Sequence, residues 1–148
     1  MNLEEGIQRG IFAREPAKAG ELQQLLAALT RRLDDARRPQ NHPDTQLDQV
    51  YLAILTCALA ALRNEGVRPV DPGVCQPEIL DSLEDTLHLE RLRIDTCQRI
   101  RELRGRAIRE GVLVAPRDVA AGLEEAIWLA ERLQRWLEDQ DRVAPLPN

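Results

Sequence analysis

VYLAILTCALAAL, residues 50–62, is apolar at every position except Thr56. Pro43 suits the first turn of a helix and Gly66 suits the position just past a helix end, so the stretch predicts one helix from Pro43 to Glu65. Because this helix is apolar on nearly every side, it belongs in the middle of a bundle. The apolar run falls short of the ~20 residues that a bilayer requires, so we expect no membrane span.

The segments around this helix predict further helices. ELQQLLAALTRRLDDA (21–36) carries one apolar stripe with helical spacing, and Pro77 can start a helix that carries Ile79, Leu80, Leu83 and Leu87. Further helices are expected at about 3–13, 91–110 and 116–138. GVLVAP (111–116) is the only candidate strand, and it would have no partner. The sequence therefore predicts an all-α bundle of five to six helices, forming a single domain over 1–148.

Composition excludes several classes of function. A net charge of −5 and a pI near 5.1 argue against a nucleic-acid binder that relies on overall positive charge. Three cysteines with no C-x-x-C pair indicate neither a disulfide framework nor a zinc site, so no metal or cofactor is predicted. The start, MNLEEGIQRG, has acids where a signal peptide needs basic residues, which favours a cytoplasmic protein.

The predicted helix 91–110 is rich in arginine. On a helical wheel, Arg93, Arg101 and Arg104 fall within its apolar sector. They either extend their charged ends to water and pair with acids of neighbouring helices, or face a cleft or oligomer interface that binds phosphate or carboxylate. Gly105 weakens the helix by about 1 kcal/mol, which is consistent with a close backbone approach or a bend. The candidate acids are Asp34, Asp35, Asp48 and Asp81.

A few other residues are candidates for a site. His42 lies in the loop before the apolar helix, and His88 is placed near the end of the helix that follows Pro77. Tyr51 is expected in the core with its hydroxyl hydrogen-bonded, or beside the arginines. Trp128 and Trp136 lie on nearly one side of the last helix, where they form either the rim of the core or an interface anchor.

Several short patterns, taken in order over residues 20–140, resemble the HEPN domain family. They are the L-x-D-A ending of the second helix (Leu33, Asp35, Ala36), Tyr51 and Ala53 in the apolar helix, then Gly66, Arg68 and Pro69, and finally the L-R-x-R run (Leu103, Arg104, Arg106).

This resemblance implies an up-and-down bundle of four or five helices, commonly a homodimer. Many members of the family are metal-independent RNases in toxin–antitoxin, phage-defence or RNA-processing systems. Others are non-catalytic partners of small nucleotidyltransferases. The RNase members carry an arginine, usually a polar neighbour, and a histidine four to six residues after the arginine.

Here the chain departs from the RNase pattern. Arg104 can stand at the family's arginine position, but Gly105 replaces the polar residue and no histidine follows. An arginine alone cannot move protons near neutral pH. We therefore expect a non-catalytic HEPN-like module. Two alternatives remain: an RNase in which His88 or Tyr51 replaces the missing histidine, and a purely structural interaction protein. The expected setting is a bacterial toxin–antitoxin-like or nucleotidyltransferase-linked system, with a homodimer, a nucleotidyltransferase-type partner, and RNA or a nucleotide as candidate partners.

Overall fold

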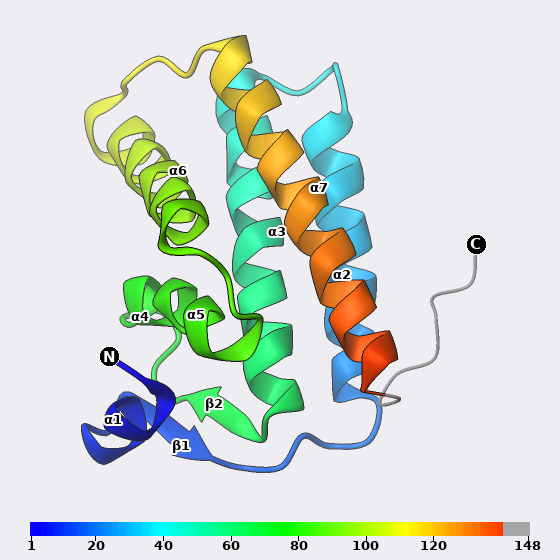
Figure 1. Cartoon of the computed structure of the whole chain (residues 1–148). Coiled ribbons are helices and arrows are strands. Elements are labelled where there is room, and N and C mark those ends of the chain that lie inside the picture. Colours follow the sequence, from blue (N-terminus) through cyan, green and yellow to red (C-terminus); the bar gives the residue numbers. More distant parts are fainter. Residues whose placement is uncertain (141–148) are drawn as a thin grey trace.

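Four long helices run alternately up and down in the computed structural model, which describes residues 1–140 (Figure 1). This arrangement confirms the predicted all-α bundle, and the final eight residues of the predicted domain, 141–148, lie outside the described residues. The long helices are α2 (Glu21–Arg37), α3 (Pro43–Asn64), α6 (Arg91–Glu110) and α7 (Pro116–Asp139).

Helix α3 is the centre of the bundle and packs against α2, α6 and α7. Its side chains are buried around most of the helix, including Val50, Ala53 and Ile54, as its apolar sequence predicts. Within residues 1–140 it is the one helix long and apolar enough to cross a membrane, but 61% of that stretch is buried inside the protein. Burial in the bundle accounts for the apolar composition without a bilayer.

The predicted limits of α3 are confirmed. Pro43 occupies the first turn after the N-cap residue His42, and Gly66 follows the helix with a φ of 71°. That left-handed conformation is easily adopted by glycine. The helix predicted to start at Pro77 is instead two short ones, α4 (Gln76–Asp81) and α5 (Leu83–Thr86), which meet at Ser82.

A two-stranded antiparallel sheet was not predicted. Strand β1 (Phe12–Arg14) pairs with β2 (Val67–Pro69), and Ala13 lies opposite Arg68. The opening helix α1 covers only Leu3–Gln8, so the expected helix over about 3–13 was wrong in its second half. The chain turns at Gly10, which has a φ of 75°, and then buries the Phe12 ring in the core. The only predicted strand candidate, residues 111–116, forms no strand, because 111–115 have no regular structure and Pro116 begins α7.

One buried arginine joins the sheet to the bundle. Arg63, near the end of α3, is 6% exposed, and its Nε and Nη2 donate to the two carboxylate oxygens of Glu21 at 2.9 and 3.2 Å. It also donates to the main-chain oxygens of Glu15 (3.0 Å) and Pro16 (3.3 Å). Arg63 therefore fastens the segment between β1 and α2 to the end of α3.

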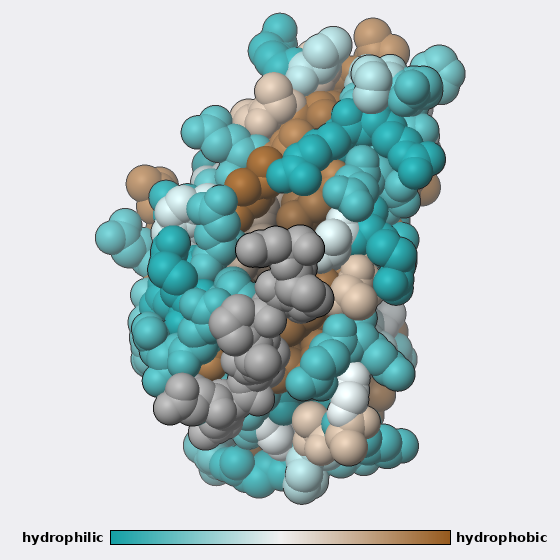
Figure 2. All heavy atoms as spheres, turned by 90° about the vertical axis from the view of Figure 1, so that its right-hand side faces the viewer, coloured by the Kyte–Doolittle hydropathy of each residue, from teal (hydrophilic) through white to brown (hydrophobic). Residues whose placement is uncertain are grey.

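The outer faces of α2 and α7 follow the usual amphipathic pattern. On this side of the bundle, hydrophobic side chains lie between bands of hydrophilic ones (Figure 2). Both helices carry apolar residues that are partly buried against the core, among them Leu25 of α2 and Leu123, Ile127 and Ala130 of α7. The two helices thus cover α3 with their apolar stripes and turn their charged residues to solvent.

Candidate functional site

The three arginines predicted to share one sector of α6 lie in two different surroundings. Arg101 and Arg104 lie near Tyr51 of α3, whereas Arg93 lies against Trp128 of α7. The helical wheel places the three residues at similar angles, but eight residues of helix separate Arg93 from Arg101. That distance along the axis, about 12 Å, gives them different neighbours. The candidate site is therefore built from Arg101, Arg104 and Tyr51.

Arg104 is held by α3 through two contacts. Its Nε donates to Asp48 Oδ1 at 2.9 Å, which matches one of the acids proposed from the sequence. Its guanidinium also lies over the ring of Tyr51, 5.1 Å from the ring centre, in a cation–π contact. The side chain is 26% exposed. Among the described residues, its two terminal nitrogens have no hydrogen-bond partner.

Arg101 is held more loosely than Arg104. Its Nε donates to Gln98 Oε1 at 2.8 Å, and its Nη2 lies 3.8 Å from Glu102. Gln98 is itself fixed, because its amide donates to the main-chain oxygen of Pro77 at 2.9 Å and to Asp81 at 3.1 Å. Arg101 is 30% exposed, so the guanidinium is positioned by a fixed amide while its terminal nitrogens stay accessible.

Tyr51 lies in the core with its hydroxyl hydrogen-bonded and also lies beside the arginines, the two positions considered from the sequence. Its side chain is fully buried and its hydroxyl donates to Gln76 Oε1 at 2.6 Å. Burial raises the pKa of Tyr51 to about 12, although the positive charges of Arg101 and Arg104 act in the opposite direction. The phenol therefore stays protonated near neutral pH, and Tyr51 does not provide a general base there.

The histidines do not complete the arginine site within one chain. His88 is exposed, has a φ of 56°, and lies in the turn between α5 and α6. Arg104 is thirteen residues beyond the first residue of α6, a rise of about 20 Å along the helix. His42 is exposed at the start of α3 and makes no side-chain capping bond. Within one chain, neither imidazole therefore lies beside Arg101 or Arg104.

Nearer the start of α6, Arg93 forms a contact that spans two helices. Its Nη1 donates to both oxygens of Glu125 at 3.0 and 3.1 Å, and its guanidinium lies 3.4 Å from the centre of the Trp128 ring. Trp128 is partly buried, which fits the rim of the core. Trp136 is 8% exposed and belongs to the core, so little of its ring is available to a partner.

Gly105 does not have the first of the roles considered from the sequence, a close backbone approach. The helix continues through it to Glu110, and no neighbouring backbone approaches it. A Cβ added at this position would lie 2.6 Å from Nη1 of Arg109, whose side chain folds back over the glycine. Gly105 therefore leaves room for a side chain of its own helix.

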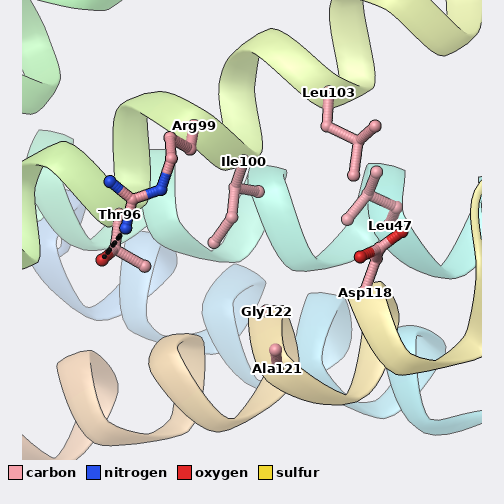
Figure 3. A pocket seen from close by; sticks show the side chains of 8 residues that line it. All are labelled: Leu47, Thr96, Arg99, Ile100, Leu103, Asp118, Ala121 and Gly122. Carbon is pink, nitrogen blue, oxygen red and sulfur yellow. Dashed lines mark hydrogen bonds between the residues drawn. The ribbon is translucent and has the colours of Figure 1, made fainter.

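A groove lies between α6 and α7, beside Leu47 of α3 (Figure 3). The two helices are joined by residues 111–115, and both pack against α3 (Figure 1). The volume of the groove is about 390 Å³. Sequence reasoning missed it because Arg99 falls on the solvated face of the helical wheel. Gly122, buried inside a helix, was the available signal for a close approach of two elements. The α6–α7 groove is lined by Leu47, Thr96, Arg99, Ile100, Leu103, Asp118, Ala121 and Gly122.

Comparison with known proteins gives no family for the chain: no family model matches it, and neither a curated protein nor a solved structure does. Within residues 1–140, no group of three or more His, Cys, Asp or Glu side chains could hold a metal ion. The three thiols, Cys57, Cys75 and Cys97, are buried and free. Burial raises the pKa of all three, so they stay protonated near neutral pH.

Proposed function

We propose that this chain is a non-catalytic, HEPN-like binding module whose Arg101–Arg104 pair receives a phosphate group of a nucleotide or of RNA. One observation carries the proposal: two partly buried guanidiniums lie near the same tyrosine, and their terminal N–H groups make no hydrogen bond with the described residues, the nearest acid being Glu102 at 3.8 Å from Arg101 Nη2. Guanidinium groups bind phosphate oxygens through paired, charge-assisted hydrogen bonds.

The site's chemistry favours binding over cleavage. An RNase of this kind needs a group that exchanges protons near neutral pH, and the pKa of Tyr51 is raised to about 12. His88 lies at the opposite end of α6 from the arginine pair within one chain. The pair can hold a phosphate in place, but among residues 1–140 of the same chain no imidazole lies beside it to act on the 2′-hydroxyl.

A purely structural role is supported by a different observation. Asp48 already pairs with Arg104, and Glu102 lies near Arg101. These acids reduce the local positive charge and weaken the attraction for a phosphate. However, Asp48 contacts Arg104 through Nε alone, which leaves the Nη side of the guanidinium for a second acceptor.

We propose that the module works as a homodimer or beside a small nucleotidyltransferase-type partner, in a toxin–antitoxin-like setting.

Calorimetric titration with a short 5′-phosphorylated RNA and with a mononucleotide tests this function. Arg101→Gln and Arg104→Gln should each weaken binding by about tenfold, as expected for the loss of a charge-assisted pair at a partly exposed site. Arg109→Gln is the matched control, because Arg109 is exposed on the same helix and makes no ion pair with the described residues.

The same RNA, recovered after incubation, should be intact. Equal affinity in the wild type and in both site variants would refute the phosphate site and favour the structural role. RNA cleavage that disappears in Arg104→Gln and persists in Arg109→Gln would instead establish the RNase alternative. Sedimentation of the same samples measures the oligomeric state, and a monomer at all concentrations would refute the homodimer.

A further inference from the structure

Among residues 1–140, Arg99 has no ion-pair partner, and it lies at the edge of the α6–α7 groove. Asp95 and Glu102 lie one helical turn away on either side, where an arginine of a surface helix ordinarily finds an ion-pair partner. Instead, Nη2 of Arg99 donates to Thr96 Oγ1 at 3.0 Å (Figure 3). Arg99 forms no ion pair with the described residues. Its positive charge therefore remains available to an anion in the groove.

The groove beside Arg99 has an apolar interior. Leu47 of α3 and Ile100 and Leu103 of α6 line it, and Gly122 of α7 lies close to α3. A Cβ added at Gly122 would lie only 3.0 Å from Cγ1 of Val50, so α7 approaches α3 closely because this residue has no side chain. The volume of about 390 Å³ lies within the range of small-molecule sites. A ligand bound here can place an apolar body against these side chains.

Asp118 limits the charge that the groove accepts. Its carboxylate also lines the groove, and its Oδ2 accepts a hydrogen bond from the Ala115 N–H at 3.3 Å, at the start of α7. A ligand with two negative charges would meet repulsion from this carboxylate, whereas a ligand with one charge can place it beside Arg99. The remaining polar group that lines the groove, the Thr96 hydroxyl, is already used in bonds to Arg99 and to the Leu92 main-chain oxygen.

We propose that the α6–α7 groove binds an organic monocarboxylate with an apolar body, whose carboxylate pairs with Arg99. This site is separate from the Arg101–Arg104 pair. Residues 99 and 101 point about 200° apart around α6, so the two sites lie on opposite flanks of one helix. The groove takes its apolar lining from α3, α6 and α7, and a ligand there would join α6 to α7.

Calorimetric titration of the full chain with octanoate, and with octanol as its uncharged counterpart, tests the proposal. Octanoate should bind the wild type at least about tenfold more tightly than octanol, because the carboxylate pairs with Arg99. Arg99→Gln should remove that preference. Arg109→Gln is the control, since it removes a charge of the same helix outside the groove.

Ala121→Trp provides a second, independent arm. Ala121 is exposed and lines the groove, so a tryptophan there fills the space from outside the core. Circular dichroism should show a helical content like that of the wild type, while octanoate binding is lost. Absence of octanoate binding by the wild type, equal binding of octanol, or full binding by Arg99→Gln would each overturn the proposal. Arg101→Gln and Arg104→Gln should bind octanoate normally, so this proposal and the phosphate site fail independently.

Discussion

Replacement of Arg63 by methionine should lower the stability of the bundle substantially. Methionine keeps much of the apolar volume but removes four hydrogen bonds. The main-chain oxygens of Glu15 and Pro16 lose their partner, at about 1 kcal/mol each. Glu21 loses a paired cation, but its side chain is 32% exposed, so water replaces part of the interaction. We expect the free energy of unfolding to fall by about 3 kcal/mol.

The effect of this substitution should depend on pH. The hydrogen bond from Arg63 holds the pKa of Glu21 below its ordinary value of 4.5. A lowered pKa means that the ionised carboxylate stabilises the folded state above about pH 4.5, and that this contribution is lost as the pH falls through the lowered pKa. The difference between wild type and variant should therefore be full at neutral pH and smaller at about pH 3.

Urea unfolding followed by circular dichroism measures both effects. Arg68→Met is the matched control, because Arg68 is 40% exposed and pairs with the half-exposed Glu15. It should change stability by less than about 1 kcal/mol. A loss below about 1 kcal/mol for Arg63→Met, or a loss that is the same at both pH values, would refute this account of the buried arginine.

Two further predictions concern packing near the site and the sheet. Tyr51→Phe should lower the free energy of unfolding by about 1 kcal/mol, because the hydrogen bond to Gln76 is lost. In the wild type, the phenolate absorbance of Tyr51, the sole tyrosine, should rise with a midpoint near pH 12. The stability of the wild type should fall as the pH rises from about 10 toward that value. A midpoint near 10 in the folded protein would contradict the burial argument. Gly6→Ala should lower stability by about 1–3 kcal/mol in thermal unfolding, because its Cβ would lie 2.5 Å from the Phe12 ring. Gly73→Ala, whose nearest contact is at 3.6 Å, should leave the melting temperature nearly unchanged, and equal effects of the two would refute the close-contact explanation.

The parts of the fold that depend on local pattern could be predicted from the sequence. The apolar character of residues 50–62 identified the central helix, and Pro43 and Gly66 marked its ends, because both residues act through their own backbone. The sheet could not be predicted in the same way. Each strand has three residues, too few for a recognisable pattern, and its partner lies beyond α2 and α3 in the sequence, so local periodicity does not reveal the pairing.

The candidate site was predicted in part for a related reason. Helical periodicity placed Arg101 and Arg104 on the core side of α6, and both do lie beside α3. It also grouped Arg93 with them, because a wheel ignores distance along the axis. Arg99 was assigned to solvent, since periodicity does not show that α6 and α7 diverge and leave a groove between them.

The pairing of β1 with β2 has a consequence for the order of folding. The strands enclose residues 15–66, which hold α2 and α3 and the short turn between them. Contacts within that helical hairpin are local, whereas the strands must close a much longer loop, whose entropic cost is greater. We therefore expect α2 and α3 to pack against each other first. The first fourteen residues should dock onto them afterwards, when β1 pairs with β2.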